Sequence, residues 1–296
     1  MQNGGTEPEA VTRWEIGDVR VTRILELPPM AFDPAMFLKT TREEVLQRQD
    51  WLVPDFATPS GDIILHFQAF IIEAAGKRIM VDPCIGNDKQ RTAPELNMLD
   101  TAFLERLAEA GFPRESVDYV VCTHLHVDHC GWNTMWHDGN WVPTFPNARY
   151  LFARAELDFI QIDTDEPDAQ AIYQDSVKPI VDAGLAEFVE DGHVVVQGVW
   201  LEATPGHTPG HRSVMITSEG QDAIITGDVI HHPIQMTLPD VCSHFCWNEN
   251  MAITTRRTVL DRAARQSATV IAAHFAGPTA VQVVRDGDAW MVGARR

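Results

Sequence analysis

Four side chains that could bind metal ions lie within six residues of one another, in the segment THLHVDH. They are His124, His126, Asp128 and His129. Alternate residues of an extended chain point the same way, so we expect His124 and His126 to share one ion. The tight turn that follows would let Asp128 and His129 face a second position. Neutral imidazole and carboxylate are common zinc ligands, so the segment predicts metal-dependent chemistry rather than a polar surface loop.

Three further candidate ligands follow apolar stretches later in the chain. His207 lies in the Gly/Pro-bounded segment TPGHTPGH, Asp228 lies in TGD, and His274 follows the apolar run VIAA. A single histidine at such a place is more often structural. Three candidates at strand ends, downstream of the first cluster, favour one shared site on loops held by a rigid scaffold.

The elements that must position these residues alternate between strands and helices. Apolar and β-branched runs predict strands at 18–27, 62–73, 78–81, 117–122, 148–153, 194–202, 212–217, 223–226 and 268–273. Helical spacing predicts helices at 41–50, 100–110, 154–162, 165–183 (kinked at Pro179) and 250–266, and two strands close the chain around Asp286-Gly287. Residues 1–13 are expected to be irregular. This order predicts mixed sheets with helices packed outside, in an α/β or α+β sandwich.

The length and composition favour a single large domain. The chain has 296 residues, of which 45% are hydrophobic, and no long linker interrupts it. We expect residues 1–61 to form an N-terminal strand and wrapping segment on the domain built by 62–296. For residues 28–61 the alternatives are a lid, a contact in a homodimer, or a brace.

Charge and cysteine content narrow the class of partner. The formal net charge is −19, which argues against nucleic acid because phosphate backbones require clustered Lys and Arg. No stretch approaches the ~20 apolar residues of a membrane span, and the N-terminus lacks the pattern of a secretory signal. Five cysteines without a disulfide-type spacing favour a reduced, cytoplasmic setting. A small-molecule substrate is the expected partner.

Together these motifs resemble the metallo-β-lactamase superfamily, in the branch that carries HxHxDH followed by separate His, Asp and His ligands. The resemblance covers roughly 62–280. It implies an αβ/βα four-layer sandwich of two mixed β-sheets with helices on both outer faces. It also implies one ion on His124, His126 and His207, a second on Asp128, His129 and His274, and Asp228 as a bridge. The expected cofactors are two divalent ions, zinc first, with Mn²⁺, Fe²⁺ and Co²⁺ as alternatives.

The activity implied by this resemblance is hydrolysis of a small ester or lactone by a metal-bridging hydroxide. Two ions about 3.5–4 Å apart can clamp a reacting oxygen and lower the pKa of bound water toward ~7. Asp128 would orient the hydroxide or carry a proton to the leaving group. Organophosphate, amide and thioester hydrolysis are alternatives within the same class. A mononuclear iron oxidoreductase similar to persulfide dioxygenases is the alternative from another class.

Four residues near the motifs are assigned less specific roles. In similar proteins an Asp at the place of Asp82 supports a metal-binding histidine, although a turn-capping role is equally consistent with the sequence. His211 could support the site from behind. In N-acyl-homoserine lactonases a substrate-contacting tyrosine lies three residues after the bridging Asp, where this chain has His231. The His231-His232-Pro run is more similar to methyl-parathion-hydrolase-like proteins, and one of these histidines either contacts substrate, donates a proton or is structural.

The aromatic and cysteine residues near the motifs have two interpretations. Trp132, Trp136, Trp141 and Phe145 could form the wall of an apolar pocket, but core packing is favoured. Cys130, Cys242 and Cys246 lack a partner pair for a separate zinc site, so we expect packed thiols.

Overall fold

Two sheets form the centre of the structure, a computed structural model that describes residues 10–162 and 168–293. Within these residues the first sheet has seven strands in the order β1-β2-β5-β6-β7-β10-β11. Strands β6, β7, β10 and β11 run parallel, and β1, β2 and β5 are antiparallel to their neighbours. The bounds are β1 (Val11–Ile16), β2 (Val19–Leu25), β5 (Gln68–Ala74), β6 (Lys77–Val81), β7 (Tyr119–Val121), β10 (Arg149–Ala153) and β11 (Ala186–Val189).

The second sheet also has seven strands in the described chain, in the order β12-β13-β14-β15-β16-β17-β18. Only β15 and β16 pair in parallel among these neighbours. The bounds are β12 (Val194–Val196), β13 (Val199–Ala203), β14 (Arg212–Ser218), β15 (Gln221–Ile225), β16 (Thr269–Ile271), β17 (Ala280–Asp286) and β18 (Ala289–Val292).

Central strands are apolar on both faces because each face meets a different layer. In β5, Phe70 and Ile72 pack between the sheets, whereas Ala69 and Ile71 pack against the outer helices. Strand side chains alternate between faces, so an unbroken apolar run such as FII marks a strand that is covered on both sides.

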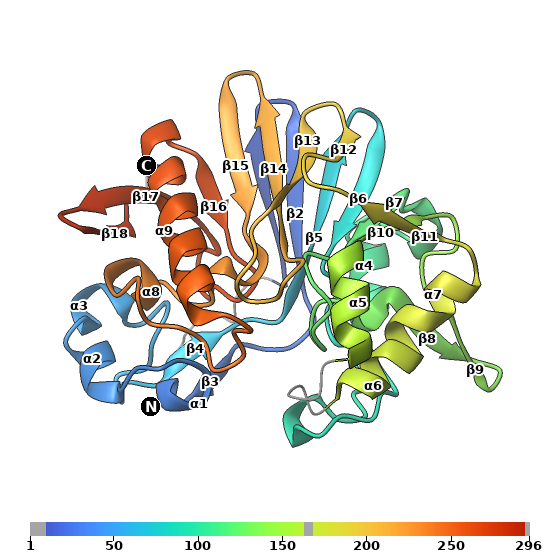
Figure 1. The fold of residues 1–296 in the computed structure, drawn as a ribbon, viewed down its shortest axis with the longest axis horizontal. Helices are drawn as coiled ribbons and strands as arrows, with labels where there is room; N and C mark the ends of the chain where they lie inside the picture. Colours follow the sequence, from blue (N-terminus) through green and yellow to red (C-terminus); the bar gives the residue numbers. More distant parts are fainter. Residues whose placement is uncertain (1–9, 163–167, 294–296) are drawn as a thin grey trace.

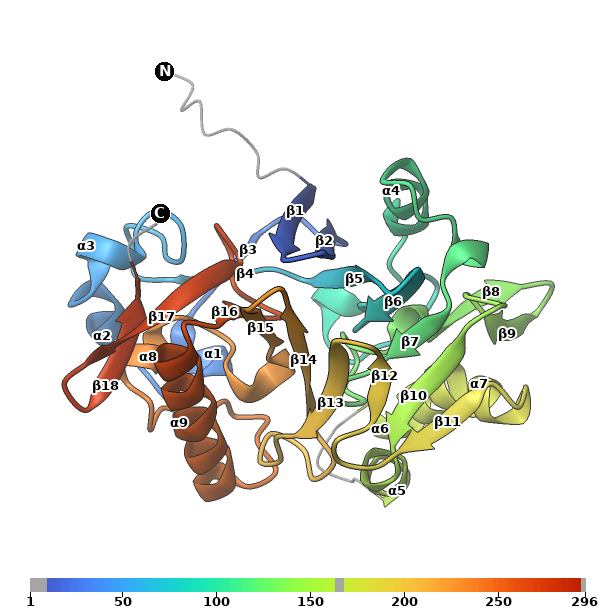
Figure 2. The ribbon, with the colours of Figure 1, turned by 90° about the horizontal axis from the view of Figure 1, so that it is seen from above.

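Helices cover the outer face of each sheet. The first sheet is covered by α4 (Phe103–Glu109), α5 (Arg154–Ile162), α6 (Ala169–Ile172) and α7 (Lys178–Asp182), and the second by α8 (Ile234–Thr237) and α9 (Glu249–Gln266). Figure 1 shows α9 and α4–α7 on opposite sides of the strands, and Figure 2 shows the two rows of strands from above. The predicted four-layer sandwich is therefore confirmed. Across the described residues, no helix combines the length and the apolar character needed to cross a membrane.

The segment between β2 and β5 packs on α8. Strand β3 (Met30–Phe32) pairs with β4 (Ile63–Leu65), and three short helices lie between them: α1 (Pro34–Phe37), α2 (Arg42–Leu46) and α3 (Gln49–Leu52). Leu38, Val45 and Leu52 pack with Ile234 of α8 in a separate apolar cluster. A small hairpin of β8 (Thr134–His137) and β9 (Asn140–Pro143) projects from the other side.

Several predicted elements differ from the structure in their limits. Residues 11–13 belong to β1 rather than to an irregular tail, and 1–9 lie outside the described residues. The predicted strand 62–73 divides at 66–67, because the His66 N–H bonds to the His274 carbonyl instead of a neighbouring strand. The predicted strand 194–202 folds back at Gly198, whose φ of +82° suits glycine.

The predicted helix 165–183 consists, over its described part, of α6, a π-helical turn (Tyr173–Val177) and α7. Pro179 lies in the first turn of α7. The three segments follow one another without interruption from Ala169 to Asp182, and the irregular π-helical turn lies directly before α7, next to the position of the predicted kink.

Candidate metal centre

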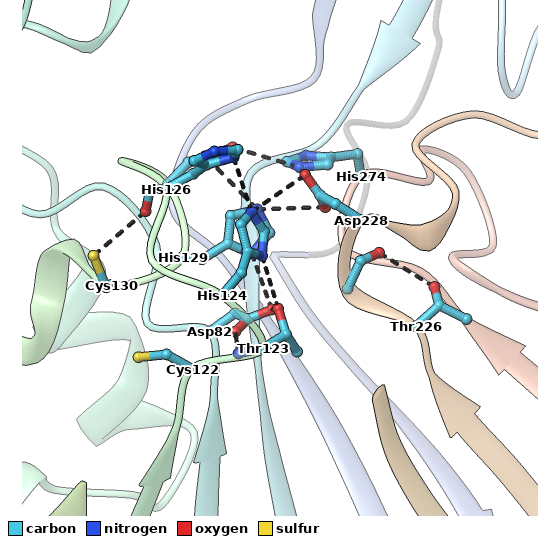
Figure 3. A network of polar contacts seen from close by, with 12 residues as sticks. Asp82, Cys122, Thr123, His124, His126, His129, Cys130, Thr226, Asp228 and His274 are labelled. Atoms are coloured by element: carbon cyan, nitrogen blue, oxygen red, sulfur yellow. Dashed lines mark hydrogen bonds and ion pairs between the residues drawn. The ribbon is translucent and has the colours of Figure 1, made fainter. Parts of the chain in front are cut away.

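The candidate ligands lie on loops that leave one edge of the sandwich. The His124–His129 turn follows β7, the His207 loop follows β13, Asp228 follows β15 and His274 follows β16. Strand β13 runs in the same direction as β15 and β16, because it is antiparallel to β14, which is antiparallel to β15. The carboxyl ends of these strands therefore bring residues from distant parts of the sequence together (Figure 3).

Three histidines form the first cluster of candidate ligands. His126 Nδ1 lies 3.1 Å from His124 Nε2 and 2.9 Å from His207 Nε2. Their facing nitrogens all lie within 4.8 Å of one another. Burial lowers the pKa of both His124 and His207 well below the usual value. Neutral rings with converging nitrogens are the form of histidine that binds a metal ion.

Asp128, His129 and His274 form the second cluster. His274 Nε2 lies 3.4 Å from Asp128 Oδ2, and His129 Nε2 lies 3.6 Å from Asp128 Oδ1. The donor atoms of these three groups also lie within 4.8 Å of one another. Burial opposes a charge on His129, but the carboxylates of Asp228, Asp128 and Asp82 raise its pKa well above the usual value. The surroundings of this cluster therefore favour positive charge.

Asp228 lies between the two clusters and turns one oxygen toward each. Its Oδ2 lies 3.3 Å from His207 Nε2 and 3.7 Å from His124 Nε2. Its Oδ1 lies 3.4 Å from His129 Nε2 and 3.2 Å from His274 Nε2. A carboxylate in this position can bind two cations at once.

Two of the candidate donor atoms, one from a histidine and one from the central carboxylate, are buried without a hydrogen bond. Neither His129 Nε2 nor Asp228 Oδ1 makes one within the described structure. Buried polar atoms are nearly always satisfied, and leaving one unpaired costs about 1–3 kcal/mol. Nitrogen and oxygen atoms that converge in this way fit the binding of divalent cations.

In His129 and His274, the ring nitrogen that points away from the centre lies within hydrogen-bond distance of an oxygen atom. His129 Nδ1 lies 2.9 Å from Asp82 Oδ2, and His274 Nδ1 lies 2.9 Å from the His66 carbonyl oxygen. Asp82 also accepts hydrogen bonds from the Thr123 N–H (2.7 Å) and hydroxyl (2.8 Å). With the Nδ1–H donated to an oxygen, each ring directs its Nε2 toward the centre, as metal-binding histidines do. The structure thus places Asp82 beside a candidate ligand.

His211 supports the Asp228 backbone. Its Nε2 accepts the Asp228 N–H at 3.0 Å, and its Nδ1 lies 2.8 Å from the Thr204 hydroxyl. Burial lowers the pKa of His211 to about 3, so the ring stays a neutral acceptor. The intervening Gly227 has a φ of +50°, and a Cβ there would lie 2.7 Å from His211 Nε2, so this close approach requires glycine.

His231 and His232 point to different places. His231 Nε2 lies 3.1 Å from Asp228 Oδ2, and both of its ring nitrogens are buried without a hydrogen bond. In His232, Nδ1 accepts the Ile234 N–H at 3.1 Å, and Nε2 lies 2.8 Å from the Phe56 carbonyl oxygen. Of the two histidines, it is His231 whose ring reaches the clusters.

An apolar cavity of about 290 Å³ opens onto the clusters. His126, Asp128, His207, Asp228, His231 and His274 line its polar end. Its walls come from five segments of the chain and include Phe32, Phe37, Leu65, Phe67, Leu96, Val127 and Phe245. The cavity can therefore take a molecule whose reacting group faces the clusters and whose remainder is apolar.

The four aromatic residues considered for the pocket lie outside the cavity, and the favoured interpretation, core packing, holds for Trp132 and Phe145 but not for the exposed Trp136. Trp132 stacks on Phe103 with ring centroids 5.7 Å apart, and Phe145 is buried in the outer core. Trp136 and Trp141 contact each other on the β8–β9 hairpin. None of these four is among the described residues that line the cavity. The wall residues were missed because they are scattered phenylalanines without a shared motif.

The cysteines are free thiols. Cys130 is buried in the outer core, and Cys242 is also buried. Cys246 Sγ lies 3.7 Å from His207 Nδ1, so this thiol contacts a candidate ligand from behind, a role that the sequence did not suggest.

Comparison with known proteins finds similar enzymes and similar folds. The chain is 29% identical over 119 residues to an N-acyl homoserine lactonase of Bacillus sp, and 28% identical over 120 residues to the N-acyl homoserine lactonase AttM of Agrobacterium fabrum. These matches cover 40% of this chain and 40% and 42% of the relatives. The chain thus spans well under half the length of the curated relatives it matches.

Solved structures match along nearly the whole chain. The dizinc quorum-quenching lactonase AidC, solved with the product N-hexanoyl-L-homoserine, has a TM-score of 0.82 at 18% identity, covering 97% of this chain and 98% of that one. The hydrolase AbOPH has a TM-score of 0.78 at 22% identity, covering 98% and 100%. At these identities the likeness concerns the fold.

The family model of the metallo-beta-lactamase superfamily matches residues 68–287. That range includes every candidate ligand from His124 to His274 and most of both sheets. The chain belongs to the metallo-beta-lactamase superfamily.

Proposed function

We propose that this chain is a metal-dependent hydrolase that holds two divalent ions, zinc first, and cleaves a small ester or lactone. The observation that carries the proposal is Asp228, whose two oxygens each face a separate cluster of ligand atoms. His124, His126 and His207 would hold one ion, Asp128, His129 and His274 the other, and Asp228 both. When bound, such a pair lowers the pKa of water toward ~7 and polarises the substrate oxygen.

The chain's own residues supply the remaining parts of the mechanism. The apolar walls bind the acyl or alkyl part of the substrate and exclude water around the reacting bond. Asp128 is half-buried at the cavity and can carry a proton to the leaving group. His231, whose Nε2 lies 3.1 Å from Asp228 Oδ2 and whose Nδ1 makes no hydrogen bond in the described structure, can donate a hydrogen bond to a substrate oxygen. Asp82 and His211 keep His129 and Asp228 oriented.

The choice of an ester or lactone is supported by the cavity and by the relatives. The described lining contains no Lys or Arg that would bind a phosphate or carboxylate group of a substrate. The curated relatives are lactonases, and AidC was solved with the product of an acylated lactone.

A hydrolysis screen with metal control tests this proposal. We expect metal-free protein to be inactive, and zinc or manganese to restore cleavage of lactones and aryl esters above thioesters and phosphotriesters. His126→Ala should lose bound metal together with at least about 100-fold in kcat/KM, since metal-ion catalysis supplies several kcal/mol. His137→Ala, an exposed histidine on β8, should behave like the wild type.

Two outcomes would contradict the proposal. A protein with two bound zinc ions that cleaves neither lactones nor esters would exclude the substrate class. One bound iron, with oxygen consumption on a persulfide substrate, would favour the oxidoreductase alternative instead.

A further inference from the structure

Glu156 is a buried acid in the first turn of α5 that the metal centre described above does not use. Helix α5 begins directly after β10, which runs parallel to β7. Glu156 therefore lies at the same edge of the first sheet as the His124–His129 turn. Leu157 and Ile160 of the same helix pack into the outer core, which fixes the helix and with it the carboxylate.

The two oxygens of Glu156 hold two different loops. Oε2 accepts the Leu125 N–H at 3.1 Å, and Oε1 accepts the Gly210 N–H at 2.7 Å. Leu125 lies between His124 and His126, and Gly210 follows His207 by three residues. These two loops carry all three histidines of the first cluster.

The absence of a side chain at Gly210 permits its contact with Glu156. A Cβ at this position would lie 2.9 Å from Glu156 Oε1 and 2.7 Å from the Glu156 backbone nitrogen. No ordinary side chain tolerates such distances, so the second glycine of TPGHTPGH allows the carboxylate to reach the loop. This explains a feature of the motif that metal binding alone does not require.

Burial of the Glu156 carboxylate costs free energy. Burial raises the pKa of Glu156 to about 7, and the N–H groups of Gly210 and Leu125 oppose that rise. Hydrogen bonds of this kind are what allow a carboxylate to remain in a protein interior.

We infer that Glu156 is a positioning residue that fixes the distance between the His124–His126 loop and the His207 loop. It would thereby set the affinity of the first cluster for its metal ion. The inference rests on the proposed metal centre, because Glu156 can position ligands for an ion only if the first cluster binds one.

Glu26 provides a matched control. It is also buried, it accepts the Ile85 N–H (2.7 Å) and the Gly86 N–H (3.1 Å), and burial raises its pKa as well. Its other described donors are Trp132 Nε1 (2.6 Å), three residues after His129, and the Thr101 hydroxyl (3.4 Å). Among the described hydrogen bonds of Glu26, none comes from residues 124–126 or 204–211, which carry the first cluster. Glu26→Gln and Glu156→Gln therefore remove the same kind of interaction in different places.

The experiment is a titration of metal-free protein with cobalt(II), followed by its visible absorption and by competition with a chelator. We expect Glu156→Gln to weaken the tighter bound cobalt by about 10–100-fold, the range typical of groups that orient metal ligands, and to change the absorption spectrum. Glu26→Gln should lose thermal stability but keep the wild-type affinity and spectrum. Gly210→Ala, which displaces the carboxylate without altering its charge, should reproduce the effect of Glu156→Gln.

Wild-type affinity and spectrum in both Glu156→Gln and Gly210→Ala would overturn the inference. So would a loss of affinity that Glu26→Gln shares in proportion to its loss of stability, because the role would then be general. If the wild type itself bound no cobalt, the metal centre would fail, and the positioning role with it.

Discussion

At the scale of single residues, the adjacent His231 and His232 differ in their hydrogen-bond partners. Both ring nitrogens of His231 are buried without hydrogen bonds beside Asp228, whereas both of those of His232 are bonded to backbone groups. A ring at the end of a cavity whose nitrogens make no hydrogen bond can still donate one to a bound molecule. A ring with both nitrogens engaged already has its partners.

His231→Ala is expected to lower kcat by about 100-fold with an unchanged metal content, because one proton or hydrogen-bond donor to the reacting group contributes about that much. Steady-state kinetics on an aryl ester, with metal analysis of the same preparation, would measure this. If metal is lost along with rate, His231 is a ligand instead, since its ring also lies with His207 and Asp228 in a group that could hold an ion.

At the scale of elements, His232 joins the N-terminal segment to the second sheet. It precedes α8, and its Nε2 reaches the carbonyl of Phe56, next to the cluster in which Leu52 and Ile234 pack. Residues 28–61 are thereby attached to the domain at the place where Phe32 and Phe37 enter the cavity wall.

This contact predicts a dependence of stability on pH. Burial lowers the pKa of His232 to about 4, against about 6.5 in the unfolded chain. The unfolded state therefore binds the proton first, so the free energy of unfolding should fall as the pH drops from about 6.5 to 4, by up to about 3 kcal/mol from this residue.

Denaturant unfolding of metal-free wild type and His232→Gln across that range would measure the difference. The variant should be less stable at pH 7 and should show a shallower decline toward pH 4. Parallel curves for the two proteins would assign the acid sensitivity to other groups.

The sequence predicted the sandwich, and the residues that the structure brings together in the candidate metal centre, better than it predicted the cavity. Apolar runs such as FII and the helical spacing of the residues of α9 are visible in the sequence itself. The HxHxDH segment holds enough potential ligands within six residues to indicate a metal site. The β8–β9 hairpin does have a local signal, the Asp138-Gly139 turn between the paired residues His137 and Asn140, although the strands predicted from the sequence do not include it. The division at 66–67 depends on the long-range hydrogen bond from the His66 N–H to the His274 carbonyl, which no local pattern encodes. Phe37 and Phe245, 5.8 Å apart between ring centroids, are 208 positions apart along the chain, so only the folded structure identifies them as one wall.

At the scale of the whole molecule, the excess of acidic residues in the chain is also found in the lining of the cavity. The formal net charge is −19, and the described lining contains Asp and Glu side chains but no Lys or Arg. Of these, Glu95 is exposed, and Asp168 accepts the Thr92 N–H at 2.9 Å. A substrate with a remote negative charge would meet repulsion here, whereas an uncharged one would not.

Glu95→Lys should therefore raise kcat/KM for an anionic ester, such as mono(4-nitrophenyl) glutarate, by about five- to tenfold at low salt. The value for 4-nitrophenyl butyrate should not change, and the gain should shrink at high ionic strength. Glu109→Lys, on the exposed side of α4, serves as the control for a change in net charge. An equal response to both substrates would mean that Glu95 does not discriminate charge.

Part of the cavity wall comes from a segment of the chain that is separate from the ligand loops. Phe32 and Phe37 belong to a segment that supplies no candidate ligand, while the ligands stand on loops at the ends of sheet strands. Sequence drift in the N-terminal segment can thus alter which molecules are admitted and leave the cation-holding groups untouched. An evolving lineage could in this way exchange one substrate for another while its hydrolytic apparatus is inherited whole.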